Sequence, residues 1–251
     1  HGAMESSQSH MELAQALADR FTVYLPDRRG RGLSGPFGQD YSIQKDVEDM
    51  DALLNKTGAH SVFGVSSGAI ITLTAALSLP AIHKAAIFEP PLVINNSLPT
   101  AFLARYDEEI AQGDMAAALV TGMLGSQMGP PVFNKIPRWL LKLLTITMMD
   151  KKSSDNDVTM RMLAPTLHYD FQLVNEAAGA LDSFKAIRAE VLLLGGSTSP
   201  TYLKVALDAL AQVFPQAKRI EFPGLGHGAS GPTAMGGKPE WVAHELRRFF
   251  V

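Results

Sequence analysis

The stretch SVFGVSSGAI, Ser61–Ile70, places a serine between two glycines at the end of a short apolar run. Gly64 and Gly68 lie two residues to either side of Ser66, and a helix-compatible run follows. A sharp strand-to-helix turn requires this spacing, because a side chain at either glycine would collide with neighbouring backbone. Such a turn exposes the Ser66 hydroxyl above the end of the strand and points the first N–H groups of the helix towards it. The pentapeptide alone also fits an ordinary Gly/Ser turn, so the rest of the chain decides between these two interpretations.

Apolar, strand-like runs alternate with helical periodicity on both sides of this turn. The expected strands are Phe21–Pro26, the run that ends at Val65, Lys84–Phe88, Glu190–Gly196 and Lys218–Phe222. The expected helices are Met11–Arg20, Ile43–Thr57, the helix after Ser66 to about Ser78, and the stretches from about Tyr202 to Phe214 and from Lys238 to Phe249. Strands that alternate with helices predict an α/β fold with a mostly parallel, doubly wound sheet.

Residues 92–185 interrupt this alternation, because they contain several helical stretches and no clear strand. The simplest interpretation is a helical lid, or cap, inserted over the sheet. The predicted domain organisation is therefore a core of residues 1–91 and 186–251 with a helical lid insertion of residues 92–185.

The composition limits the possible functions. The chain has 251 residues, of which 46% are hydrophobic, and a formal net charge of −3. This size suits one large domain that buries about 70–75% of its unfolded surface. The charge pattern has no basic block, which argues against nucleic acid and anionic membrane partners, and no apolar stretch reaches the ~18 residues of a membrane span. The absence of cysteine excludes disulfides and thiolate metal sites and fits a reducing compartment, so we expect a cytoplasmic protein.

Four motifs follow one another in the chain, each at a predicted strand end: His1-Gly2, the loop D-x-R-G-x-G-x-S at Asp27–Ser34, the turn Gly64–Gly68, and Gly224-Leu225-Gly226-His227. In these motifs, and in their order, the chain resembles the α/β-hydrolase-fold serine hydrolases. The resemblance covers residues 1–91 and about 191–251, and it implies that the turn at Ser66 is a nucleophile elbow. It also implies the chain order of nucleophile, acid and histidine.

A serine hydroxyl becomes a good nucleophile only when a base takes its proton. His227 is the candidate base, because it lies in a glycine-rich loop after the last long strand, from which its ring can reach the elbow. The other six histidines, at positions 1, 10, 60, 83, 168 and 244, occupy less suitable places. By the resemblance, the backbone N–H groups of Ala3 and Ser67 form the oxyanion hole.

The acid departs from the commonest pattern of the family. The usual position after Glu190–Gly196 reads Gly-Ser-Thr-Ser-Pro, with Ser199 where an aspartate would stand, and a serine cannot stabilise an imidazolium by charge. Glu89 follows the strand after the elbow helix, and haloalkane dehalogenases and fungal zearalenone lactonases resemble this arrangement with a glutamate acid there. The expected triad is therefore Ser66, Glu89 and His227. Two alternatives stay open: Glu89 caps a loop before two prolines, or Asp170 of the lid supplies the acid.

The expected reaction is acyl transfer to water from an ester, lactone or related carbonyl compound, with no metal or cofactor. A serine elbow argues against dehalogenase and epoxide hydrolase chemistry, which use aspartate there. The partner is expected to be a small, apolar carbonyl substrate, and the sequence does not set the oligomeric state. Candidate substrate-binding residues are Met4, Met123, Met128 and Trp139, although such apolar lid residues equally suit packing. A C–C bond lyase, a cofactor-free oxygenase and a small-molecule receptor of the same fold stay open as alternatives.

One expectation concerns the start of the chain. In the fold that the resemblance implies, a further strand lies between Phe21–Pro26 and Ser61–Phe63, and the loop at His1-Gly2 follows it. Without that strand both neighbours would leave backbone groups unpaired, at ~1–3 kcal/mol for each buried group. We therefore expect a further segment of roughly 20–30 residues before His1, by family resemblance.

Overall fold

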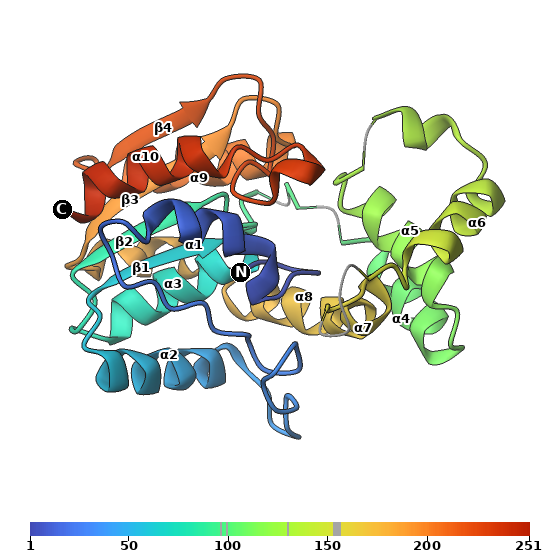
Figure 1. The fold of residues 1–251 in the computed structure, drawn as a ribbon, viewed down its shortest axis with the longest axis horizontal. Helices are drawn as coiled ribbons and strands as arrows, with labels where there is room; N and C mark the ends of the chain where they lie inside the picture. The colour runs from blue at the N-terminus through green and yellow to red at the C-terminus, as the bar shows by residue number, and fades with distance from the viewer. Residues whose placement is uncertain (96, 99, 130, 153–156) are drawn as a thin grey trace.

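The computed structural model describes residues 1–251 except 96, 99, 130 and 153–156. One parallel sheet contains β1 (Ser61–Val65), β2 (Lys84–Phe88), β3 (Glu190–Gly196) and β4 (Lys218–Phe222), in that order. These four strands were predicted and are confirmed. Val65 pairs with Phe88, and Phe88 with Leu194. Residues that follow β1, β2 and β3 therefore meet at one edge of the sheet (Figure 1).

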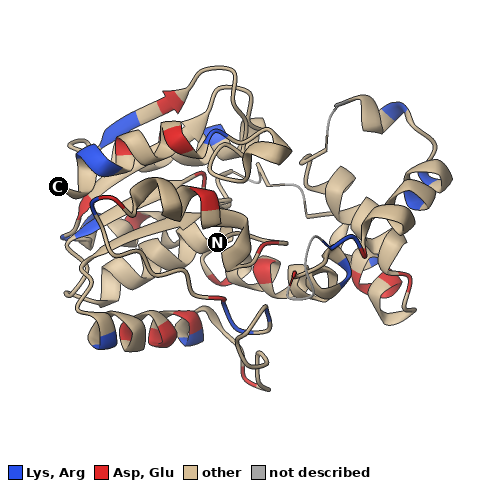
Figure 2. Ribbon diagram, in the orientation of Figure 1, with Lys and Arg blue, Asp and Glu red and all other residues tan. Residues whose placement is uncertain are grey.

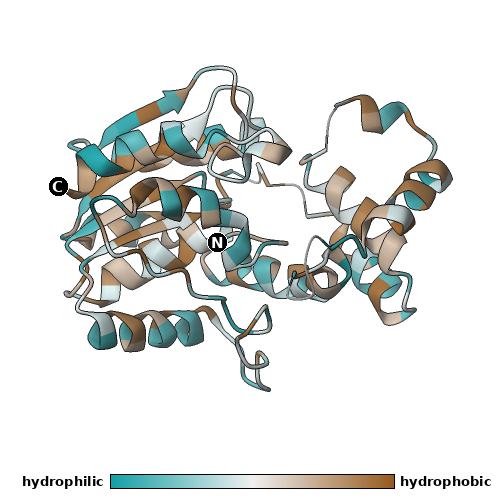
Figure 3. Ribbon diagram, viewed as in Figure 1, coloured by the Kyte–Doolittle hydropathy of each residue, from teal (hydrophilic) through white to brown (hydrophobic). Residues whose placement is uncertain are grey.

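Helices cover both faces of the sheet. One core cluster joins the sheet to α2 (Ile43–Thr57), α3 (Ser67–Ser78) and α9 (Thr201–Val213), and a second joins it to α1 (Met11–Leu17) and α10 (Pro239–Phe250). Along β2, Ala85 and Ile87 belong to the first cluster, whereas Ala86 and Phe88 belong to the second. Because alternate residues face opposite sides, a strand covered on both faces is continuously apolar (Figure 3). The predicted α/β architecture is confirmed.

Three helices have ends that differ from the prediction. α1 ends at Leu17 rather than Arg20, because Ala18 and Arg20 donate to carbonyls only three residues earlier and the chain leaves the α-helix. α10 begins at Pro239, whose fixed φ suits the first position of a helix. α9 begins at Thr201, directly after Pro200.

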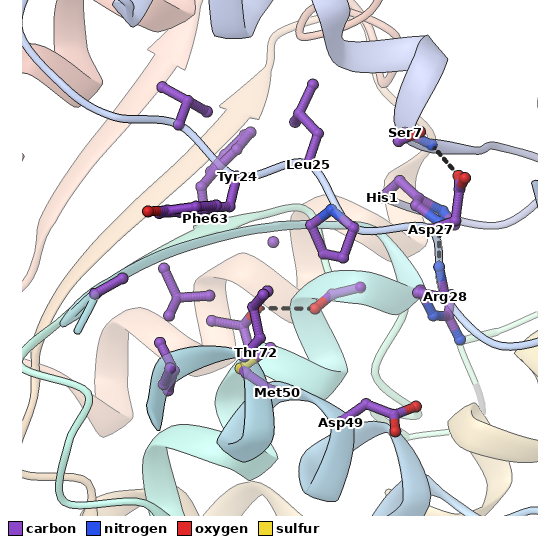
Figure 4. Close-up of a pocket in the computed structure, with 18 of the residues that line it drawn as sticks. His1, Ser7, Tyr24, Leu25, Asp27, Arg28, Asp49, Met50, Phe63 and Thr72 are labelled. Carbon is purple, nitrogen blue, oxygen red and sulfur yellow. Dashed lines mark hydrogen bonds between the residues drawn. The ribbon is translucent and has the colours of Figure 1, made fainter. Parts of the chain in front are cut away.

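The predicted strand at Phe21–Pro26 is wrong, since this segment has no strand structure. A strand needs a hydrogen-bonded neighbour, and a cavity of about 820 Å³ separates the segment from β1. Figure 4 shows Tyr24, Leu25 and Phe63 on one side of this cavity, with Met50 and Thr72 opposite. The cavity is distinct from the catalytic candidates, because Ser66, Glu89 and His227 do not line it. The expectation of a strand before His1 stays a prediction.

Residues 92–185 form helices and contain no strand among the residues that the structure describes. The elements are α4 (Leu103–Ala111), α5 (Met115–Gly125), η2 (Pro131–Lys135), α6 (Arg138–Met148), α7 (Met160–Leu163), η3 (Ala164–Thr166), α8 (Leu167–Glu176) and η4 (Ala180–Ala186). α4 to α7 stand beyond the edge where the strands end, whereas α8 contacts α3 (Figure 1). Their role as a lid domain stays a prediction.

Charged side chains of both signs lie on the outer helices, as α2 and α10 illustrate (Figure 2). Of the helices in the described part of the chain, none has the length and apolar character needed to cross a bilayer.

Candidate active site

Ser66 lies at the turn between β1 and α3 in a backbone conformation that serine rarely adopts, with φ 55° and ψ −125°. Its N–H donates to the carbonyl of Phe88 at 2.9 Å, which ties the turn to the end of β2. A Cβ at Gly64 would lie 2.3 Å from Thr72 Oγ1, and one at Gly68 would lie 2.4 Å from the His1 carbonyl oxygen. The two glycines are therefore required by close packing on both sides of the serine.

Replacing Gly64 with alanine is expected to destabilise the protein by about 1–3 kcal/mol, because the methyl group must displace Thr72 and the backbone of Gly68. The free energy of unfolding, measured by urea denaturation, checks this expectation. Gly35→Ala is the matched control, since nothing lies within 4 Å of a Cβ at that position. Equal midpoints for the two variants would contradict the close-packed turn.

Glu89 and His227 are in direct contact. His227 Nδ1 lies 2.7 Å from Glu89 Oε2, and the Gly196 N–H donates to Glu89 Oε1 at 2.6 Å. The Glu89 side chain is fully buried. Because a carboxylate oxygen only accepts, the proton of this pair resides on Nδ1, and Nε2 is left as the basic nitrogen of the imidazole. The pair has the arrangement in which a carboxylate orients a general base.

Ser66 follows β1 and Glu89 follows β2, so the register of these strands places them side by side at the same edge. The Ser66 side chain is buried, and its hydroxyl makes no hydrogen bond to His227, both residues lying in the described part of the chain. In enzymes without substrate, catalytic hydrogen bonds are often long and tighten only in the complex. The structure thus places the candidate acid Glu89, in contact with the candidate base His227, at the same sheet edge as Ser66.

Residues 1–5, which we name the oxyanion loop for the role predicted for Ala3, lie against the turn at Ser66. A Cβ at Gly2 would be 2.8 Å from Ser66 Cβ, so this loop approaches the serine as closely as packing allows. The N–H groups of Ala3 and Ser67 donate to no acceptor within the described residues. Two unpaired donors next to a serine are what an oxyanion hole requires.

Glu5 places a second carboxylate near the serine. Its Oε2 accepts from the Gly2 N–H at 2.6 Å and lies 3.1 Å from His10 Nε2. Burial alone would raise the pKa of Glu5, but the His10 contacts and the Gly2 N–H hold it at about 2. The other nitrogen of His10 faces the Ser230 carbonyl at 3.3 Å. The contacts of Glu5 with His10, and of His10 with Ser230, therefore link the oxyanion loop to the loop that carries His227.

Backbone strain is concentrated in this region. Five non-glycine residues have a positive φ in the described part of the chain, and three of them are Met4, Ser66 and Glu89. Such conformations cost on the order of 1–3 kcal/mol each and persist where the surroundings enforce them. The strain coincides with the oxyanion loop, the candidate nucleophile and the candidate acid.

Neither Asp170, the alternative acid, nor Ser199, at the position usual for the acid, is hydrogen-bonded to His227 in the described structure. Asp170 is hydrogen-bonded to Arg28, Arg31 and Ser67 and has no contact with His227 in the described structure. Ser199 is buried, and its hydroxyl has no partner among the described residues. The contact with His227 therefore comes from Glu89.

The four residues predicted to bind substrate lie in, or pack against, the helical segment of residues 92–185. Met4 packs against the cluster of Tyr106, Ala118 and Leu167. Met123 and Met128 are joined by a backbone hydrogen bond, whereas Trp139 on α6 is 70% exposed. Their role in substrate binding stays a prediction.

Sequence reasoning missed the roles of Arg28, Arg31 and Glu5. Both arginines belong to the motif Asp27–Ser34, in which the Asp27 carboxylate accepts hydrogen bonds from the N–H groups of Ser7 and Leu33. The available signal was a pair of arginines at an expected strand end together with one aspartate, Asp170, in a helix of the predicted lid. Within the described residues, no group of three or more His, Cys, Asp or Glu side chains could hold a metal ion.

Comparison with known proteins places this geometry in context. The model of the alpha/beta hydrolase family matches residues 1–245. An alpha/beta hydrolase from Sphaerobacter thermophilus is 29% identical, with a TM-score of 0.79 over 100% of this chain and 90% of that chain. Two further structures share the fold. They are an E-2-(acetamidomethylene)succinate hydrolase (19% identity, 100% and 89% covered, TM-score 0.63) and a meta-cleavage product hydrolase (14%, 98% and 88%, 0.66).

Proposed function

Because the chain belongs to the alpha/beta hydrolase family, we propose that it is a serine hydrolase that cleaves an ester, lactone or related carbonyl compound through an acyl-enzyme. The observation that carries the proposal is the 2.7 Å contact between His227 Nδ1 and Glu89 Oε2, at the sheet edge where Ser66 occupies its elbow. This contact orients a base next to a serine, which is the requirement for nucleophilic catalysis.

In the proposed reaction the Ser66 hydroxyl attacks the carbonyl carbon while His227 Nε2 takes its proton. The carbonyl oxygen becomes an oxyanion and accepts hydrogen bonds from the N–H groups of Ala3 and Ser67. The histidine then donates its proton to the leaving oxygen, and the C–O bond breaks. Water, deprotonated by His227, releases the acid and restores Ser66. Glu89 stays ionised and stabilises the imidazolium at both stages.

A burst experiment tests the proposal. Mixing the protein with excess p-nitrophenyl butyrate is expected to release about one nitrophenolate per protein molecule rapidly, followed by slower steady turnover, because the acyl-enzyme accumulates. Stopped-flow absorbance measures both phases. Protein previously reacted with a fluorophosphonate is the control, and it should show neither phase.

The alternatives predict different outcomes. A receptor of this fold or a C–C bond lyase would bind its ligand without releasing stoichiometric nitrophenolate. Absence of both burst and turnover, with p-nitrophenyl acetate tested alongside the butyrate, would overturn the hydrolase proposal.

A further inference from the structure

Asp170 is a buried charge that the proposed reaction does not use. It lies on α8, and only 1% of its surface is exposed. Its Oδ2 accepts a hydrogen bond from Arg31 Nη2 at 2.6 Å. Its Oδ1 accepts from Arg28 Nη1 at 2.9 Å and from Ser67 Oγ at 2.8 Å. Burial would raise the pKa of Asp170, but the two arginines and the Ser67 hydroxyl outweigh burial and hold the pKa below its usual value.

Arg31 connects this carboxylate to the oxyanion loop. Its Nη1 donates to the Gly2 carbonyl oxygen at 2.7 Å. That carbonyl and the Ala3 N–H are opposite ends of one planar trans peptide group, so fixing the direction of the carbonyl also fixes the direction of the N–H. The peptide group before it is also fixed, because the Gly2 N–H donates to Glu5 Oε2. Arg31 therefore determines where the Ala3 N–H points.

The same carboxylate reaches the second candidate donor. Ser67 is the first residue of α3, and its hydroxyl donates to Asp170 and accepts from Arg28 Nη1 at 3.1 Å. These bonds anchor the residue whose own N–H is unpaired among the described residues and lies directly after the strained Ser66. Asp170 is thus the junction between the two N–H groups, which come from segments more than sixty residues apart.

The arrangement is not what stability alone would favour. Arg31 is buried, yet its Nε finds no acceptor in the described structure. An unpaired buried donor is costly, and well-packed apolar residues are often as stabilising as a buried ion pair. Because the cluster holds the Gly2–Ala3 peptide in spite of this destabilising unpaired donor, we infer that its role is to orient that peptide.

We propose that Asp170 and Arg31 are positioning residues that align the N–H groups of Ala3 and Ser67 as one oxyanion hole. This inference rests on the proposed hydrolase function. Because Asp170 belongs to α8, the helix that packs on α3, the alignment also depends on a helix of the predicted lid. Neither residue touches the reacting atoms.

Asp170→Asn is expected to lower kcat on the order of 10²-fold, because a displacement of about 1 Å in a catalytic donor has that effect. KM should stay within about threefold, since the hole binds the transition state rather than the substrate. Ser67→Ala removes the two hydrogen bonds of the hydroxyl, to Asp170 and from Arg28, and leaves the charges paired, so we expect about a tenfold loss. Affinity for a trifluoromethyl ketone, which forms a tetrahedral oxyanion on the serine, should fall in the same proportion as kcat.

The matched control is Asp49→Asn, which breaks an exposed ion pair with Arg29. Arg29 lies in the same loop as Arg28 and Arg31, and this variant should keep kcat within about twofold of the wild-type value. All rates are expressed per active site titrated with a fluorophosphonate, so that unfolded protein does not count.

Two results separate the possibilities. Unchanged kcat and inhibitor affinity per titrated site, with only a lower melting temperature, would show a purely structural role and overturn the positioning proposal. If Asp170→Asn does not fold, the same measurements on Ser67→Ala distinguish a positioning role of the cluster from a purely structural one. Wild-type protein that shows neither a burst nor labelling would instead refute the hydrolase function itself.

Discussion

Ser66→Ala is expected to lower kcat on a p-nitrophenyl ester on the order of 10⁶-fold and to abolish labelling by a fluorophosphonate probe. The hydroxyl is the only group removed, and the tight elbow depends on Gly64 and Gly68 rather than on that oxygen. The melting temperature should therefore change little. Gel fluorescence of the labelled protein and circular dichroism during heating measure the two effects.

Ser67→Ala is the control for this experiment, because it alters the adjacent serine and keeps the nucleophile. Its labelling should reach the same final amount as in the wild type, although more slowly. Labelling that persists in Ser66→Ala and disappears in Ser67→Ala would show that Ser66 is not the nucleophile.

Glu89→Gln is expected to lower kcat on the order of 10⁴-fold. The amide oxygen can still accept from the Gly196 N–H, but the NH₂ group then faces His227 Nδ1 and favours the tautomer with its proton on Nε2. A histidine in that tautomer cannot take the proton from Ser66. Steady-state rates of the variant and the wild type, measured at the same pH of roughly 7.5–8, give the size of the effect.

Asp170→Asn is the comparison, with its smaller expected loss of about 10²-fold. Glu89 would not be the acid if Glu89→Gln kept kcat within about tenfold of the wild-type value while Asp170→Asn lost nearly all activity. The serine hydrolase proposal would survive that outcome.

Local pattern was sufficient to predict the four strands of the sheet and the turn at Ser66. Lys84–Phe88 and Glu190–Gly196 are buried on both faces, so their apolar runs identify them without knowledge of their neighbours. Phe21–Pro26 has the same β-branched and aromatic character, but strand structure also requires a partner, and a cavity lies where one would pair. Composition does not reveal whether a partner is present.

In the candidate site, too, some residues could be predicted from local pattern and others depend on how distant segments pack. Glu89 and His227 could be predicted because each follows a strand, and parallel strands bring their ends to one edge. The links of Asp170 to Arg31 and to Ser67 span 139 and 103 residues and depend on how α8 packs, which no local pattern encodes.

The left-handed backbone at Met4, Ser66 and Glu89 has a consequence for laboratory evolution. Glycine adopts this conformation without strain, so a selection for heat resistance would favour glycine at the strained positions. Only Met4 is open to that change, because the other two side chains are needed for the proposed chemistry. A glycine there would also let the neighbouring peptide sample more orientations. Of these three positions, residue 4 is therefore where we expect variants selected for heat resistance to acquire glycine, with a higher melting temperature and a lower kcat.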